Sequence, residues 1–256
     1  MIFCARATRG LRRPSLDARS GRSISPHPCE EVTSELGGVI CNLVRRPHVE
    51  NAEQYVAFID VLGFSSLIEA DFDGIVKVYD KMIESTAIVE KLRPDVSLRV
   101  FSDAFVIASP QLTRLVGAVQ MLLMQTLFND LLVRGGVGFG RHIEKSGEGR
   151  LQVVSQALVK AVQTEKRTTF PCVALDESVV TDESWWPKEV LNQHRGLLYF
   201  DGIRLVNPCN VAWGQSAGMR VLHLRELHPI YAEKHDWFLR LHSAIMGDEP
   251  LVPPTA

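Results

Sequence analysis

Two aspartates, Asp60 and Asp103, are the residues of this 256-residue sequence best suited to bind a metal ion. Asp60 ends the apolar segment YVAFID, and a turn at Gly63 follows directly. Asp103 lies in the polar centre of VSLRVF-SD-AFVIAS, residues 96–109. Two carboxylates brought close together repel each other unless a cation lies between them. Mg²⁺ or Mn²⁺, with phosphate oxygens and water as its other ligands, would be such a cation.

Each aspartate also has an ordinary structural explanation. Asp60 is equally suited to cap a helix or shape a turn, and Asp103 to be a plain hairpin-turn residue. Their joint placement in one topology is what favours the metal-site hypothesis. Gly63 and Ser65 would then allow backbone N–H groups to approach a phosphate at the start of the next helix.

The hydrophobic pattern predicts the elements that must position these aspartates. Short apolar runs predict strands at residues 54–61, 96–101, 104–109, 132–140 and 171–179. Apolar residues at helical spacing predict helices at residues 72–92, 112–132, 152–167 and 233–247. The Asp201-Gly202 dipeptide predicts a second hairpin within residues 197–207.

The order of these elements predicts an α+β fold, a ferredoxin-like βαββαβ sheet with a C-terminal hairpin and helix added. In such a sheet the first strand lies beside the central hairpin, so Asp60 and Asp103 can reach one point at the sheet's edge. We expect the helices on one face and the other face free for a partner or ligand. The glycine run at residues 135–140 lies within a strand pattern, so it predicts close backbone packing rather than a phosphate cradle.

Composition limits the classes of function and the location. The net charge of −2 gives no case for attraction to nucleic acid or to a membrane surface. The five cysteines are scattered and form no CxxC pair, so we expect neither a zinc site nor a disulfide framework, and a cytoplasmic location. Residues 1–50 begin with an arginine-rich, acid-poor stretch that predicts a disordered tail or, alternatively, a transit peptide. The functional domain is therefore expected over residues 51–256.

Three segments in order, FIDVLGFSSL, LRVFSDAFVIAS and VRGGVGFGR, resemble the catalytic domain of class III nucleotidyl cyclases. The first two segments are most similar to the Pycsar pyrimidine cyclases of bacterial anti-phage defence, which make cyclic UMP or cyclic CMP. The resemblance covers about residues 54–180. It implies a lyase reaction in which the ribose 3′-hydroxyl attacks the α-phosphorus and expels pyrophosphate. It also implies a homodimer, and a cyclic nucleotide that activates a separate effector protein.

The resemblance implies roles for individual residues. Asp60, Asp103 and the backbone carbonyl of Val61 would hold two Mn²⁺ or Mg²⁺ ions. Arg99 stands at the position where purine cyclases place a base-selecting residue. An arginine offers only hydrogen-bond donors, and uracil offers two carbonyl acceptors, so Arg99 favours UTP over CTP. The alternative for Arg99 is a weak surface ion pair with an acid.

The remaining substrate-binding residues are also implied by the resemblance. Phe58 would line the base or ribose pocket, and Arg141 would contact the triphosphate. The turn formed by Gly63, Phe64 and Ser65 would bind phosphate. Phe58 is equally suited to be a plain core residue, and Arg141 to be a solvated loop charge.

Two departures from purine cyclases are visible in the segment QVVSQALVKAVQTEKR. Val159 and Gln163 stand where purine cyclases carry an asparagine and a transition-state arginine. Gln152 stands near the position of an aspartate that reads adenine. These departures disfavour a purine cyclase, and they leave open a catalytically inactive nucleotide-binding module. Candidate replacements for the missing pair are Gln156, Lys160, Lys166 and Arg167.

Overall fold

The computed structural model describes residues 52–64, 68–69, 71–147, 150–179, 195–210 and 212–247. These residues belong to one compact unit, Arg45–Ala256. The tail predicted over residues 1–50 and the predicted phosphate-turn residue Ser65 lie outside the described residues. The division of the chain at residue 50 therefore stays a prediction.

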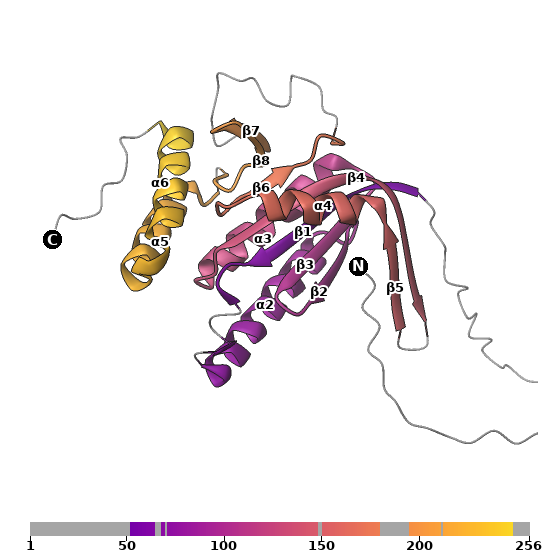
Figure 1. Cartoon of the computed structure of the whole chain (residues 1–256), viewed down its shortest axis with the longest axis horizontal. Helices are drawn as coiled ribbons and strands as arrows, with labels where there is room; N and C mark the ends of the chain where they lie inside the picture. The colour runs from indigo at the N-terminus through magenta and orange to yellow at the C-terminus, as the bar shows by residue number, and fades with distance from the viewer. Residues whose placement is uncertain are drawn as a thin grey trace, which may run out of the picture. The chain divides into compact units, whose positions relative to one another are not determined.

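One mixed sheet organises the described chain (Figure 1). Its strands are β1 Ala52–Val61, β2 Ser97–Phe101, β3 Ala104–Ser109, β4 Val133–Gly147, β5 Arg150–Ser155, β6 Val173–Leu175, β7 Leu197–Phe200 and β8 Ile203–Val206. They run in the order β2-β3-β1-β4-β6-β8-β7, with β5 paired to β4. Strand β1 is antiparallel to both β3 and β4. This arrangement confirms the predicted α+β fold and its ferredoxin-like βαββαβ unit.

Five α-helices and one 3₁₀ helix complete the described part of the fold. They are α2 Phe72–Leu92, α3 Leu112–Phe128, α4 Gln156–Arg167, α5 Gly214–Leu227, η2 Pro229–Tyr231 and α6 Ala232–Met246. Asp71 caps α2 by accepting a hydrogen bond from the N–H of Gly74. Ser155 caps α4 in the same way through the N–H of Leu158. Both caps stabilise helix starts that would otherwise leave N–H groups unpaired. None of the described helices is long and apolar enough to cross a membrane.

The two faces of the sheet carry different helices. Ile59 and Val61 of β1 point into the large core that contains residues of α2 and α3. Val56 and Phe58 point the other way, into a smaller cluster with Ala157 of α4. The expectation that all helices lie on one face is therefore wrong, because α4 covers β1 and β4 on the second face. The amphipathic pattern of α4 shows that it has a buried side, but not which face of the sheet that side covers.

The glycines of β4 allow α4 to pack directly on the strand. A Cβ on Gly136 would lie 2.2 Å from the carbonyl oxygen of Ala161, and one on Gly138 would lie 2.4 Å from that of Ala157. Side chains at these positions would push the helix away. The prediction that the glycine run marks close backbone packing is confirmed.

Two helix boundaries differ from the predictions, and one helix was not predicted. The helix predicted to start at residue 152 starts at Gln156, because residues 150–155 form β5 and pair with an extension of β4 to Gly147. The helix predicted to reach residue 132 ends at Phe128. Helix α5 was missing from the prediction. The residues that it buries include Gly214, Ala217 and Gly218, which give little hydrophobic signal.

Candidate active site

The structure brings Asp60 and Asp103 together at the end of β1. Asp60 is the cross-strand partner of Ala104, the first residue of β3. The N–H of Val61 donates a hydrogen bond to the carbonyl of Asp103, at 3.0 Å. Asp103 occupies the β2–β3 turn, in which Ser102 adopts a left-handed φ of 56°. The tight turn therefore holds Asp103 directly beside the last residues of β1.

The surroundings of Asp60 raise its pKa to about 6. Burial is the main cause, and the negative charges of Asp103 and Glu165 add to it, whereas Arg134 acts in the opposite direction. A hydrogen bond between the side chains of Asp60 and Asp103 also favours the protonated form. Without a cation, Asp60 therefore keeps its proton to a higher pH than an ordinary aspartate does.

The donor set fits a divalent metal ion. Two close carboxylates supply negative charge that a Mg²⁺ or Mn²⁺ ion would offset, and such ions take carboxylate, carbonyl and phosphate oxygens. No group of three or more acidic, histidine or cysteine ligands exists among the described residues. An ion held by Asp60 and Asp103 would therefore need oxygen ligands from a substrate or from water.

Arg134 and Glu165 extend the site and were not predicted. Arg134 is the cross-strand partner of Asp60 on β4, and its Nη2 lies 3.7 Å from Asp60 Oδ2. Its Nε lies 2.6 Å from Oε1 of Glu165, an α4 residue only 4% exposed. The sequence does carry a signal for Arg134, because it is the one charge in the strand-like run LVRGGVGFG. Glu165 gives no comparable signal, since acids are common on helices.

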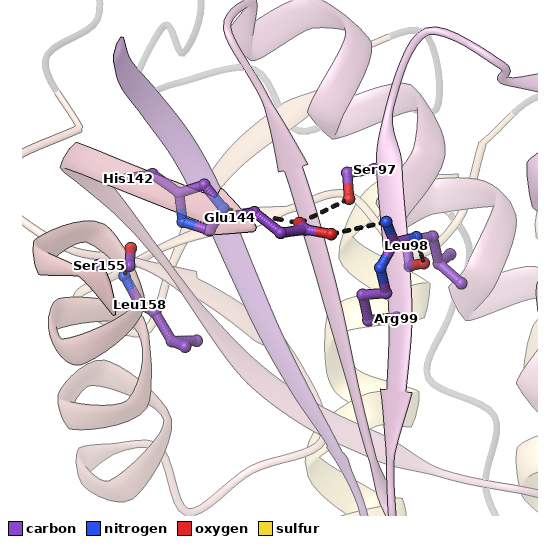
Figure 2. A network of polar contacts seen from close by, with 7 residues as sticks. All are labelled: Ser97, Leu98, Arg99, His142, Glu144, Ser155 and Leu158. Carbon is purple, nitrogen blue, oxygen red and sulfur yellow. Dashed lines mark hydrogen bonds and ion pairs between the residues drawn. The ribbon is translucent and has the colours of Figure 1, made fainter. Parts of the chain in front are cut away.

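Arg99 belongs to a polar network, drawn in Figure 2. It lies on the same side of the sheet as Phe58, because Val106 is the cross-strand partner of both residues. Its Nη2 lies 2.6 Å from Oε1 of Glu144, and its Nη1 donates to the carbonyl of Leu98 at 2.8 Å. The Ser97 hydroxyl donates to Oε2 of Glu144 at 3.0 Å. The alternative of an ion pair for Arg99 is thus observed. Its partner comes from the unpredicted extension of β4, and the side chain of Arg99 remains 40% exposed.

His142 lies beside this network and is almost fully buried. Its Nε2 is 3.9 Å from Oε2 of Glu144 (Figure 2). Burial lowers the pKa of His142 despite the nearby negative charge of Glu144. The ring is therefore neutral at neutral pH, and Arg99 is the cation that compensates Glu144.

The other predicted substrate residues are placed as follows. Phe58 is half-buried beside the small cluster under α4, on the Asp60 side of β1. Phe64 is buried in the main core, so only its backbone is available to a substrate. Gly63 has a left-handed φ of 79° and lies against Tyr231. Arg141 is exposed.

The candidate replacements on and near α4 do not form a cluster. The Lys160 Nζ donates to the carbonyl of Phe139 at 2.9 Å, which ties it to β4. The side chains at the three positions that depart from purine cyclases and at three further candidates are exposed: Gln152, Val159, Gln163, Gln156, Lys166 and Arg167. No residue of this set contacts Asp60 or Asp103 through a hydrogen bond or ion pair in the described part of the chain.

Comparisons with known proteins give distant structural matches. No protein-family model matches the sequence, and no curated protein matches it. Among solved structures, a bacterial light-regulated adenylyl cyclase matches at 16% identity over 52% of this chain and 45% of its own, with a TM-score of 0.42. The guanylyl cyclase Cya2 matches at 16% identity over 64% of this chain and 94% of its own, with a TM-score of 0.44. The adenylyl cyclase CyaB from P. aeruginosa matches at 13% identity over 60% and 93%, also with a TM-score of 0.44.

Proposed function

We propose that this protein is a pyrimidine nucleotide cyclase that converts UTP to 3′,5′-cyclic UMP and pyrophosphate. The observation that carries the proposal is the convergence of Asp60 and Asp103 at the end of β1, where their proximity helps to raise the pKa of Asp60. A site with surplus negative charge and few other ligands suits metal ions that arrive with a nucleoside triphosphate.

Asp60, Asp103 and the carbonyl of Val61 would hold two Mn²⁺ or Mg²⁺ ions. When bound, such ions lower the pKa of the attacking hydroxyl and neutralise charge on the phosphates. The chain itself contributes to catalysis by positioning the groups that hold the ions and the phosphates. The β2–β3 turn fixes Asp103 against β1, and Arg134 limits the repulsion between Asp60 and Glu165. The left-handed turn at Gly63 follows Asp60 after two residues and would present N–H groups to the phosphates.

Arg99 would read the base. Two of its N–H groups are used by Glu144 and Leu98, which fixes the guanidinium and leaves its other donors available. Uracil offers carbonyl oxygens at two positions of its ring, and both accept hydrogen bonds. A fixed donor set therefore supports UTP as the substrate.

A cytidylate cyclase is the second candidate, and Glu144 is the observation that favours it. Cytosine carries an amino group where uracil has a carbonyl, and a carboxylate accepts hydrogen bonds from an amino group. Glu144 lies beside Arg99 and retains unused acceptor capacity. Arg99 and Glu144 together would then match the donor and acceptor pattern of cytosine.

The biological role follows from the resemblance to the Pycsar cyclases. We propose that the cyclic nucleotide activates a separate effector protein in antiviral defence, and that the enzyme acts as a homodimer. The half of the second sheet face that α4 leaves uncovered carries Arg99 and the exposed Phe101, and it would be the surface that meets the partner subunit.

The test is to incubate the purified full-length chain with each of the four nucleoside triphosphates and Mn²⁺. Mass spectrometry of the products should show cyclic UMP with UTP, less cyclic CMP with CTP, and no cyclic purine nucleotide. The matched control is the Asp103→Asn variant, which should give none of these products. Binding of UTP without any cyclic product would instead identify an inactive nucleotide-binding module.

A further inference from the structure

A pocket of about 80 Å³ lies between the turn after β1 and the C-terminal helices. Leu62 and Gly63 form one wall, and residues of α5, η2 and α6 form the opposite wall. Figure 1 shows α5 and α6 beyond the end of the sheet towards which the β1 arrow points. The volume is several times the roughly 10–15 Å³ that a single water needs, so a small ligand fits.

The rim of this pocket carries one lysine, Lys234. Lys234 forms no ion pair among the described residues, and its Nζ lies 5.4 Å from the centre of the Tyr231 ring. His228 is exposed at the same rim. The acidic lining residue, Asp130, is already paired with Arg220 at 2.7 Å. The pocket therefore offers positive charge that no carboxylate of its lining compensates.

The interior of the pocket adds a buried polar group. His235 is 3% exposed and lines the pocket. The backbone of Tyr231 lies beside its ring, but Nδ1 forms no hydrogen bond of normal geometry among the described residues. The pocket walls also contain leucines, among them Leu131 and Leu224, whose apolar side chains lower the local dielectric. A lower local dielectric strengthens the attraction between Lys234 and an anion.

The pocket is close to the proposed metal site. Gly63 lines it, and only three peptide units separate Gly63 from Asp60, which is at most about 11 Å of chain. The Tyr231 hydroxyl lies 3.2 Å from the position that a Cβ on Gly63 would occupy. An anion in this pocket would thus contact the same turn that we propose for the substrate phosphates.

We propose that Lys234, with His228 and His235, binds a phosphate group in this pocket, so that the C-terminal helices complete the active site. This inference rests on the proposed function. The phosphate would belong either to the distal end of the substrate's triphosphate or to free pyrophosphate. Purine cyclases carry an asparagine and a positively charged arginine where this chain has the uncharged Val159 and Gln163. Lys234 would supply a positive charge to the phosphates in place of that arginine.

The test is calorimetric binding of inorganic tripolyphosphate, pyrophosphate and uridine to the full-length chain in EDTA, without metal. Tripolyphosphate should bind, and uridine should not compete for the pocket. Lys234→Met should raise the Kd for tripolyphosphate by roughly 10- to 100-fold, because a hydrogen bond to a charged group contributes about 1.5–3 kcal/mol. Lys234→Arg should restore most of the affinity. Lys77→Met, an exposed lysine change on α2, is the matched control and should leave Kd unchanged.

The outcomes separate this inference from the proposed function. Tighter binding of tripolyphosphate than of pyrophosphate would assign the pocket to the substrate, and equal binding would assign it to the released product. Unchanged tripolyphosphate affinity in a folded Lys234→Met variant, checked by its thermal unfolding, would overturn the inference even if the enzyme makes cyclic UMP. Affinity that depends on Lys234 in a protein that makes no cyclic nucleotide would instead overturn only the cyclase proposal.

Discussion

The guanidinium of Arg134 lies 3.7 Å from the carboxylate of Asp60, its cross-strand partner. The same guanidinium is 2.6 Å from the buried Glu165 of α4. One cation therefore serves two carboxylates, and Asp103 brings a third acid close to Asp60. The site is left with excess negative charge, which is the condition under which a metal ion binds best.

Arg134→Met should lower the free energy of unfolding by about 3–5 kcal/mol, because it leaves Glu165 buried without a partner. Urea denaturation measures this loss. The double variant Arg134→Met with Glu165→Met should recover most of it. Arg220→Met breaks an ion pair with Asp130 that is more than one-third exposed on both sides, so this control should cost no more than about 1 kcal/mol. A cost equally small for Arg134→Met would show that the ion pair with Glu165 contributes little.

Asp60→Asn should stabilise the metal-free protein at pH 7 by on the order of 2 kcal/mol, allowing for the solvent that still reaches this carboxylate. The pKa of Asp60 rises from 3.8 in the unfolded chain to about 6 in the folded protein. A raised pKa means that the group's stabilising contribution is complete below pH 3.8 and is lost as pH rises through about 6.

Urea unfolding in EDTA from pH 4 to pH 8 measures this dependence. The stability difference between Asp60→Asn and the parent should be small at pH 4 and reach its full value above pH 6. Mn²⁺ should raise the Tm of the parent above pH 6 and leave that of Asp60→Asn nearly unchanged. A pH-independent difference would show that Asp60 is not the group with the raised pKa.

Asp103→Ala should reduce cyclase turnover by at least about 100-fold, because it removes a carboxylate proposed to hold the metal ions that would stabilise charge at the reacting phosphates. The fold should survive, since Asp103 occupies a partly exposed turn. Product formation from UTP measures the activity, and circular dichroism checks the fold. Asp95→Ala removes a surface partner of Arg114 and is the matched control. Full activity in Asp103→Ala would exclude its role as a metal ligand.

Arg99→Met should lower kcat/KM for UTP by roughly 10- to 100-fold, the effect of losing a hydrogen bond from a charged donor. The ratio of rates with UTP and CTP should change as well, because Arg99 is proposed to read the base. Steady-state rates with both nucleotides measure this. Arg114→Met, which loses only the surface pair with Asp95, should leave the ratio unchanged. An unaltered ratio in Arg99→Met would assign base selection to another residue.

Gly138→Ala should destabilise the protein by about 3 kcal/mol, because the new methyl group would lie 2.4 Å from the carbonyl oxygen of Ala157. Displacement of α4 would also move Glu165 away from Arg134. Gly247→Ala is the comparison, because its φ of 72° opposes a side chain and no atom of the described residues lies within 4 Å. It should cost about 1 kcal/mol. Equal costs in thermal unfolding would show that α4 tolerates a larger separation from β4.

Local patterns in the sequence were sufficient to predict the βαββαβ unit. Strand and helix periods depend on neighbouring residues, so β1, α2, the β2–β3 hairpin, α3 and β4 were all predicted. The approach of Asp60 to Asp103 follows from that order alone, because the first strand lies beside the hairpin. The glycines of β4 likewise predicted close backbone packing, since a residue without a side chain in a strand indicates a close neighbour.

Only the tertiary structure decided what surrounds the two aspartates. Glu165, Glu144 and Lys234 come from a helix, a strand extension and a C-terminal helix, and their positions depend on which faces pack together. An amphipathic pattern identifies a buried side but not its partner. The sequence by itself therefore determined the pair of acids, Asp60 and Asp103. Long-range packing determined which cations and further acids lie beside them, and with these the raised pKa of Asp60.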